Sequence, residues 1–164
     1  MGTAAPFANN VFQIAYVVPD LHAAVRFFKE KLGVPGFMVW ENFMLQDQIY
    51  NGVPGDYVQS IAFGFAGDMQ IELIQPLSGV STYSEFLSHN PKGGVQHLGV
   101  LVDEFDSAVA DMTSRGYAIV QSGRNGETRL AYFDTDRDIG ILTEIVYLAP
   151  EERAKFDAMK GKRA

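Results

Sequence analysis

The chain has 164 residues, of which 47% are hydrophobic, and it contains no cysteine and only three histidines. A chain of this length can build a sizeable core unaided, and the lack of cysteine excludes zinc ribbons, disulfide frameworks, thiol nucleophiles and iron–sulfur clusters. The formal net charge of −7 argues against nucleic acid as the main partner.

The sequence also lacks the features of a membrane or secreted protein. No apolar run reaches the length of a membrane span, and residues 1–10 do not have the basic start and apolar stretch of a signal peptide. We therefore expect a soluble cytoplasmic protein that binds neither membrane nor nucleic acid, with a small molecule as its ligand.

The first half of the chain predicts a strand, a helix and three further strands. Asp20 is suited to cap the helix and Gly33 to end it, and residues 66–68 predict a hairpin turn between the last two strands. The predicted elements cover residues 11–18, 21–32, 36–40, 57–65 and 69–75.

A connector over residues 78–94 follows. Within it, Thr82 and Glu85 have the spacing of a capping box, which predicts a short helix over residues 83–89. The pattern of the first half then restarts, with a strand, a helix and three strands over residues 95–102, 103–115, 118–122, 128–134 and 141–147. A last helix is predicted over residues 150–160, because it opens with proline and two glutamates and ends in lysine.

The two halves form an internal repeat. A shift of 84 residues places Gln13 on His97, and a shift of 72 residues places Glu72 on Glu144. We therefore predict an α+β fold in which two βαβββ modules form one curved mixed sheet. The modules cover residues 9–77 and 95–148, joined by the connector 78–94 and followed by a C-terminal helix in 150–164, within a single domain of residues 1–164.

Four polar side chains interrupt otherwise apolar strands: Gln13, Glu72, His97 and Glu144. Singly, each has an ordinary interpretation as a strand-edge glutamine, a core histidine or a solvent-facing glutamate. Because they occupy equivalent strands of the two modules, a pseudo-twofold pairing would bring them together in the concavity of the sheet. Two buried carboxylates need a compensating cation, and these donors suit Co, Ni, Mn, Zn or Mg in an open site.

The sequence resembles the vicinal oxygen chelate superfamily, which includes glyoxalase I, methylmalonyl-CoA epimerase, extradiol dioxygenases and bleomycin-resistance proteins. The resemblance covers about residues 9–148 and rests on FQIAYVVPDLHAAVRFFKEKLG (12–33), MQIELIQP (69–76), GGVQHLGVLVDEFDSAV (93–109) and ILTEIVY (141–147). It implies a glyoxalase-like fold with a divalent metal at the shared concave sheet, held by Gln13, Glu72, His97 and Glu144.

Residues around these four positions distinguish between the subfamilies. The set matches the glutamine-bearing form of glyoxalase I, but Val17 and Pro76 stand where that enzyme has an Arg and an Asn that serve glutathione. The stretch from IELIQPLSG to HLGVLVD is similar to the epimerases. Bacterial epimerases place a second acid on the preceding strand, where residues 57–60 offer only Gln59.

We therefore expect a metal-dependent isomerase or epimerase that removes a proton α to a carbonyl. Acyl-CoA thioesters are a candidate class of substrate. Glu144 is the expected catalytic base, Glu72 is the second candidate, and Gln13 and His97 hold the metal. The alternatives are a lactoylglutathione lyase, an extradiol-type dioxygenase and a non-enzymatic small-molecule binder. We also expect a homodimer.

The sequence also predicts the surroundings of two other groups of residues. His22 and His89 lie on predicted helices away from the four-residue set, and we expect both to be solvated or capping residues. Aromatic and thioether side chains between Gly36 and Tyr57 either wall the pocket or belong to the ordinary core: Phe37, Met38, Trp40, Phe43, Met44, Tyr50 and Tyr57.

Overall fold

The computed structural model describes residues 7–162 of the chain. Residues 1–6, which make up most of the segment searched for a signal peptide, and residues 163–164, which end the segment predicted as the C-terminal helix, lie outside the described residues. Within residues 7–162, no helix has both the length and the apolar character needed to cross a bilayer.

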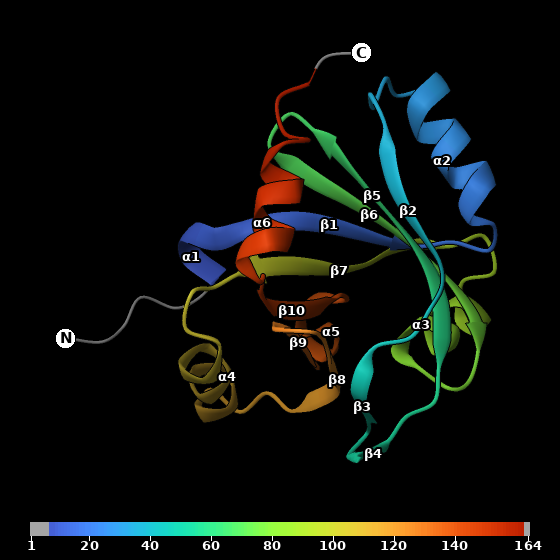
Figure 1. The fold of residues 1–164 in the computed structure, drawn as a ribbon. Helices are drawn as coiled ribbons and strands as arrows, with labels where there is room; N and C mark the ends of the chain where they lie inside the picture. The colour runs from blue at the N-terminus through green and yellow to red at the C-terminus, as the bar shows by residue number, and fades with distance from the viewer. Residues whose placement is uncertain (1–6, 163–164) are drawn as a thin grey trace.

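One sheet of ten strands organises the molecule, in the order β2-β5-β6-β1-β7-β10-β9-β8-β3-β4 (Figure 1). The strands are β1 (Val11–Val17), β2 (Phe37–Phe43), β3 (Gln46–Tyr50), β4 (Val53–Pro54), β5 (Val58–Ala66), β6 (Met69–Ser78), β7 (Gly94–Leu101), β8 (Ile119–Asn125), β9 (Thr128–Phe133) and β10 (Leu142–Tyr147). The helices are α1 (Phe7–Asn10), α2 (Leu21–Glu30), α3 (Thr82–His89), α4 (Phe105–Ser114), α5 (Asp136–Ile139) and α6 (Pro150–Asp157).

The sheet is built from two βαβββ units of the same topology. The first unit is β1, α2, β2, β5 and β6, and the second is β7, α4, β8, β9 and β10. In each unit the first strand runs parallel to the last, and the two first strands, β1 and β7, pair antiparallel at the centre. This arrangement confirms the predicted α+β fold with two βαβββ units in a curved mixed sheet.

The helices α2 and α4 cover the outer, convex side of the sheet (Figure 1). Helix α2 begins where predicted, because the Asp20 carboxylate accepts a hydrogen bond from the Ala23 amide at 2.9 Å. Its Leu21 and Phe28 are buried in an outer core under the first unit, and Met112 of α4 is buried in the equivalent core under the second. A third core fills the inside of the curved sheet.

Helix α6 packs on the inner side and crosses in front of β1 and β7 (Figure 1). Its Phe156 packs against Phe63 of β5, with the ring centroids 5.0 Å apart. Its Glu152 accepts hydrogen bonds from Asn125 Nδ2, at 2.9 Å, and from the hydroxyl of Thr128. These contacts fasten α6 to the hairpin between β8 and β9, so the helix closes one side of the concavity.

The structure differs from the sequence-based expectations in several places. The capping box of α3 is formed by Ser81 and Ser84 instead of Thr82 and Glu85, because each serine hydroxyl accepts from the other's backbone N–H. Strands β3 and β4 and the short helices α1 and α5 were not predicted. Strand β3 pairs with β8 of the second unit, so the chain crosses after β2 towards the opposite edge of the sheet.

Candidate functional site

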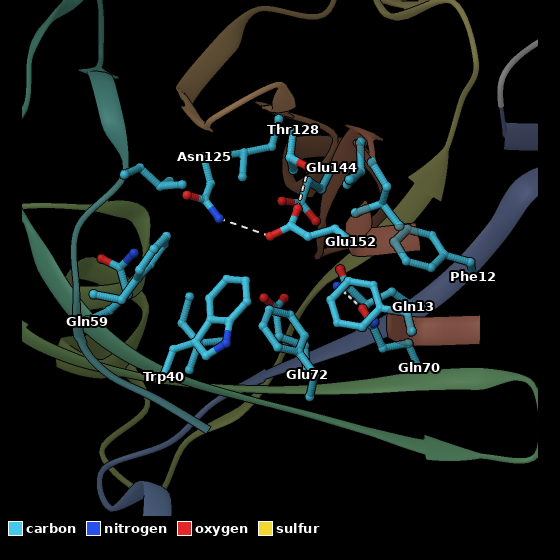
Figure 2. A pocket seen from close by; sticks show the side chains of 18 of the residues that line it. Phe12, Gln13, Trp40, Gln59, Gln70, Glu72, Asn125, Thr128, Glu144 and Glu152 are labelled. Carbon is cyan, nitrogen blue, oxygen red and sulfur yellow. Dashed lines mark hydrogen bonds between the residues drawn. The ribbon is translucent and has the colours of Figure 1, made fainter. Parts of the chain in front are cut away.

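The four polar residues singled out in the sequence lie on four adjacent central strands. Glu72, Gln13, His97 and Glu144 come from β6, β1, β7 and β10, which are neighbours in the sheet. All four are buried, and His97 is completely inaccessible to solvent. Ligand atoms of Glu72, His97 and Glu144 lie within 4.8 Å of one another, and Gln13 lines the same cavity as the two glutamates (Figure 2).

The two central strands make room for their side chains with small partners. Gln13 of β1 lies opposite Gly99 of β7, and His97 of β7 lies opposite Ala15 of β1. A Cβ atom added at Gly99 would lie 2.5 Å from Gln13 Oε1. The absence of a side chain at Gly99 is therefore required for the observed position of the Gln13 amide.

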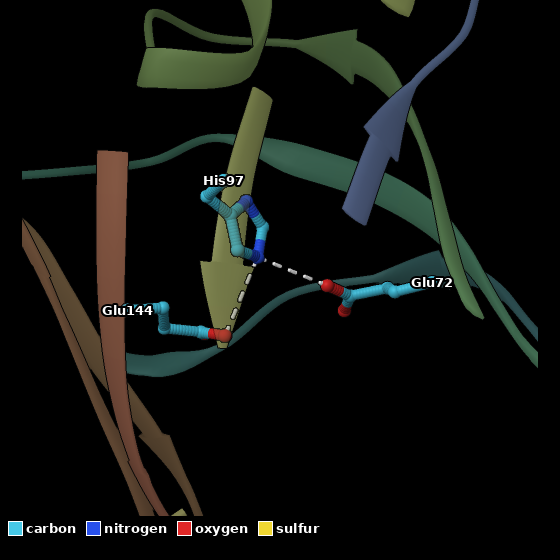
Figure 3. Close-up of side chains that lie close together, drawn as sticks. All are labelled: Glu72, His97 and Glu144. Atoms are coloured by element: carbon cyan, nitrogen blue, oxygen red, sulfur yellow. Dashed lines mark ion pairs between the residues drawn. The ribbon is translucent and has the colours of Figure 1, made fainter. Parts of the chain in front are cut away.

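His97 stands between the two carboxylates (Figure 3). Its Nε2 atom lies 3.2 Å from Glu72 Oε2 and 3.3 Å from Glu144 Oε2. These are ion-pair distances without hydrogen-bond geometry, and these three atoms, together with Gln13 Oε1, have no hydrogen-bond partner among the described residues. Four buried atoms of metal-ligand type are thus left uncompensated in one place, which is costly unless a further group binds them.

Two further glutamines orient the ligand atoms. Gln96 Oε1 lies 2.6 Å from His97 Nδ1, so it accepts the Nδ1 hydrogen and directs Nε2 at the carboxylates. Gln13 Nε2 donates to Gln70 Oε1 at 2.7 Å, which fixes the direction of the Gln13 oxygen. The sequence analysis did not identify Gln70 or Gln96. The available signals were their positions, two residues before Glu72 and one before His97.

The electrostatics of the cluster favour a bound cation. Burial lowers the pKa of His97, but the carboxylates of Glu144 and Glu72 outweigh burial and raise that pKa to about 9. Burial raises the pKa of Glu72, with the opposing influence of His97 and a further contribution from Glu144. The Tyr132 ring packs edge-on against His97 at 4.8 Å, and burial holds the pKa of its hydroxyl well above the usual range. The donor set, two carboxylates with an imidazole and an amide oxygen, fits a divalent cation.

A cavity opens in front of Gln13, Glu72 and Glu144 (Figure 2). Of the candidate wall residues, Trp40 and Phe43 line it, whereas Phe37, Met38, Met44, Tyr50 and Tyr57 do not. The complete lining is Phe12, Gln13, Trp40, Phe43, Leu45, Gln59, Ile61, Phe63, Gln70, Glu72, Tyr83, Asn125, Thr128, Leu130, Tyr132, Glu144, Val146, Leu148, Glu152 and Phe156.

The other two histidines lie outside this cavity. His22 is exposed on α2 and its Nε2 lies 2.7 Å from Glu41 Oε1. His89 is exposed in the last turn of α3, where its Nδ1 lies 2.9 Å from the Glu85 carbonyl oxygen. Neither lies in the buried cluster, as expected from the sequence.

A comparison with known families agrees with this geometry. Residues 12–133 match the family described as the Glyoxalase/Bleomycin resistance/Dioxygenase superfamily. The chain belongs to this superfamily. The match confirms the resemblance to vicinal oxygen chelate proteins and covers both central strands of the sheet.

Relatives within the superfamily include several epimerases. Human mitochondrial methylmalonyl-CoA epimerase is 31% identical over 103 residues, which are 62% of this chain and 51% of that protein. The bovine mitochondrial enzyme is 30% identical over 136 residues, covering 80% of this chain and 70% of the relative. An ethylmalonyl-CoA/methylmalonyl-CoA epimerase from Cereibacter sphaeroides is 30% identical over 110 residues, with coverages of 67% and 73%. The matched region spans about half the length of the human relative.

Solved structures of superfamily members share the fold. Methylmalonyl-CoA epimerase from Mycobacterium tuberculosis superposes with a TM-score of 0.63 at 21% identity, covering 93% of this chain and 97% of that chain. A variant of the Streptomyces coelicolor enzyme in complex with 2-nitronate-propionyl-CoA gives a TM-score of 0.62 at 21% identity, with coverages of 85% and 97%. At these identities the superpositions establish the architecture of the sheet.

Proposed function

We propose that this protein is a metal-dependent epimerase that removes and returns the proton on the carbon beside the thioester carbonyl of an acyl-CoA. The observation that carries the proposal is the buried group of Glu72, His97 and Glu144, whose ligand atoms are unpaired among the described residues. The two glutamates of this group line a cavity together with Gln13. The epimerase relatives support the reaction class and the acyl-CoA substrate class.

In this proposal Gln13, Glu72, His97 and Glu144 hold the metal. A divalent ion bound there would act as a Lewis acid and stabilise the negative charge that develops on the carbonyl oxygen as the α-proton leaves. Gln96 and Gln70 keep His97 and Gln13 in a ligating orientation. As a neutral ligand, Gln13 leaves the site more electrophilic than a third carboxylate would.

Glu144 is the proposed base. It is buried at the cavity surface, where its carboxylate can face the substrate. It would take the α-proton from one face of the substrate. Inversion needs a proton delivered to the opposite face, and Glu72 is the candidate for that second role or, in the reverse direction, for the base. Phe156 and the rest of α6 close one side of the cavity and limit the access of water to the deprotonated carbon.

The test is hydrogen exchange at the α-carbon. The purified protein is incubated in D₂O with methylmalonyl-CoA and with ethylmalonyl-CoA, with Co²⁺, Ni²⁺, Mn²⁺, Zn²⁺ or Mg²⁺ added after treatment with a chelator. We expect deuterium incorporation, followed by mass spectrometry, that is lost with the chelator and restored by at least one metal. Absence of metal-dependent α-deuteration across a broad acyl-CoA panel would contradict the proposal.

The other functions considered from the sequence predict different outcomes. A lactoylglutathione lyase would turn over the glutathione–methylglyoxal adduct, and we expect no turnover because Val17 is buried in the core and Pro76 has no donor to offer. A dioxygenase of the extradiol type uses two histidines and one carboxylate around Fe(II), and His97 is the one histidine of this site. A non-enzymatic binder would bind no divalent ion after purification.

A further inference from the structure

Gln96 has one polar atom that the proposed metal centre does not use. Its Oε1 lies 2.6 Å from His97 Nδ1, whereas its Nε2 has no hydrogen-bond partner among the described residues. Gln96 is only 3% exposed, so an unpaired Nε2 donor is unfavourable in the free protein. A group that accepts a hydrogen bond from Nε2 would remove this penalty.

Gln96 also lines a second pocket, which shares no lining residue with the cavity in front of the metal centre. Helix α3, the segment between β9 and β10 and the turn after β3 form its walls. The carboxylates of Glu72 and Glu144 face the Nε2 atom of His97 (Figure 3), and Gln96 contacts the ring at Nδ1. Gln96 therefore connects the second pocket to the metal centre through His97.

The charges of the second pocket favour a cationic ligand. Glu85, Asp134 and Asp136 line it, and no lysine or arginine does among the described residues. Arg137 pairs with Asp134 at 3.3 Å, which leaves Glu85 and Asp136 without an ion pair in the described part of the chain. The last turn of α3 belongs to the same wall, and the carbonyl end of a helix also favours positive charge.

A single metal ion does not fit the second pocket. Within residues 7–162, only Glu72, His97 and Glu144 bring three ligand atoms within 4.8 Å of one another. An anion such as the phosphates of CoA is disfavoured by the carboxylates. An ammonium group on a small organic molecule can form charge-assisted hydrogen bonds with them, and a carbonyl oxygen of the same molecule can accept from Gln96 Nε2.

We propose that the pocket beside α3 binds a small molecule that combines an ammonium group with a carbonyl acceptor, and that this ligand strengthens metal binding through Gln96. The ammonium group lies against Glu85 and Asp136, and the carbonyl accepts from Gln96 Nε2. Once Nε2 is paired, the amide is held with Oε1 directed at His97 Nδ1. By linkage, a bound metal strengthens binding of the small molecule by the same factor.

The pocket and its coupling to the metal rest on different premises. The pocket does not depend on the proposed function, because it shares no residue with the cavity of the metal centre. The coupling depends on a metal held at Glu72, His97 and Glu144. Binding is therefore measured on the metal-free protein first, so that failure of the epimerase activity leaves the test of the pocket unaffected.

The first measurement follows binding by NMR. Metal-free protein labelled with ¹⁵N is titrated with N-acetylputrescine, which carries both groups, and with N-butylacetamide and butylamine, which carry one each on the same four-carbon chain. We expect N-acetylputrescine to bind about tenfold more tightly than either other probe. Shifts are expected in α3 and residues 134–142 and not at Trp40, which lines the other cavity. No binding, equal affinities of the three probes, or shifts centred on Trp40 would overturn the proposal.

Two double variants test the contact with the ammonium group. Glu85→Gln/Asp136→Asn removes two carboxylates of the pocket, and Glu30→Gln/Glu151→Gln removes two exposed carboxylates outside it. We expect the first pair to weaken N-acetylputrescine binding about tenfold and to leave N-butylacetamide binding unchanged, and the second pair to change neither. An equal loss in both double variants would indicate an effect of net charge and contradict the assignment.

The last measurement tests the coupling. The affinity for Zn²⁺ is determined by competition with a chromogenic chelator, with and without saturating N-acetylputrescine. We expect Zn²⁺ to bind about fivefold more tightly with the small molecule present, the worth of one neutral hydrogen bond. This increase is expected to be absent in Gln96→Leu. An unchanged Zn²⁺ affinity of the wild type, or the same increase in Gln96→Leu, would refute the coupling.

Discussion

The two βαβββ units place their site residues at equivalent positions but orient them by different means. In the first unit, the Gln13 amide is held by Gln70 on the neighbouring strand β6. In the second unit, the His97 ring is held by Gln96, the residue before it on β7. The difference shows that the repeat preserves the strand positions of the candidate ligand residues. The hydrogen bond that orients each side chain is specific to its unit.

The outer strands of the two units differ further. In the first unit, β5 presents Gln59 and Phe63 to the cavity, beside Trp40 and Phe43 of the neighbouring strand β2. In the second unit, the corresponding strand β9 presents Thr128 and Tyr132, and Thr128 is engaged by Glu152 of α6. The first unit thus contacts α6 through aromatic packing of Phe63 on Phe156, whereas the second unit holds α6 through hydrogen bonds to Glu152.

The largest expected effect separates the two glutamates, one from each unit. Replacing Glu144 by Gln removes the proposed base, and we expect the rate of α-deuteration to fall by about 10²–10⁴-fold at saturating metal, with an unchanged circular dichroism spectrum. Glu72→Gln serves as the comparison and is expected to lose less. Full activity in the Glu144 variant would refute its assignment as the base.

A phenylalanine of the inner helix α6, compared with one of the outer helix α2, tests whether α6 packs on the inner core. Phe156→Ala removes a buried ring of the inner core, and we expect the free energy of unfolding to fall by about 3–5 kcal/mol. Phe27 of α2 is 52% exposed, so Phe27→Ala is the matched control with an expected loss below about 1 kcal/mol. Urea unfolding measures both, and similar losses would show that α6 does not pack as described.

The two orienting glutamines can be removed one at a time. Gln70→Leu releases the Gln13 amide, and Gln96→Leu releases the His97 ring. We expect each change to weaken divalent-metal affinity by about 10–100-fold, measured by competition with a chromogenic chelator. A larger loss of metal affinity in Gln96→Leu than in Gln70→Leu would show that the second unit depends more strongly on its orienting glutamine. Unchanged affinity in both variants would mean that neither glutamine orients a ligand.

The smallest expected effect concerns the starts of the two outer helices. Asp20 caps α2 through the Ala23 amide, whereas Glu104, at the same position before α4, makes no side-chain capping hydrogen bond. Asp20→Ala is expected to cost about 1 kcal/mol of unfolding free energy, and Glu104→Ala less than about 0.5 kcal/mol. Equal changes in urea unfolding would contradict this asymmetry.

The sequence was sufficient to predict the repeat, the central strands and the convergence of Glu72, His97 and Glu144, because polar residues on apolar strands stand out at equivalent places. The capping box of α3 was predicted one residue late, since Ser81 and Ser84 satisfy the same spacing. Strand β3 was missed because its sequence QDQIY lacks a regular alternation of apolar and polar residues.

Other features depend on contacts that no local pattern encodes. The pairing of Gln13 with Gln70 follows from the parallel register of β1 and β6, which place these two residues side by side. The inward packing of α6 depends on Asn125 and Thr128 of a distant hairpin, and Phe156 is one of few apolar residues in that helix. Gln59 is buried with neither amide atom hydrogen-bonded among the described residues, and this can be recognised only once its surroundings are known.

The crossing of the chain after β2 makes the two halves of the sheet depend on each other. The two units are joined at the centre by β1 and β7, and again at the rim, where β3 of the first half pairs with β8 of the second. Replacing either half by the half of a related protein would therefore require both the β1–β7 pairing and the β3–β8 pairing to be preserved. Residues 46–54, which contain β3 and β4, therefore belong with the second half in the sheet although they precede it in the chain.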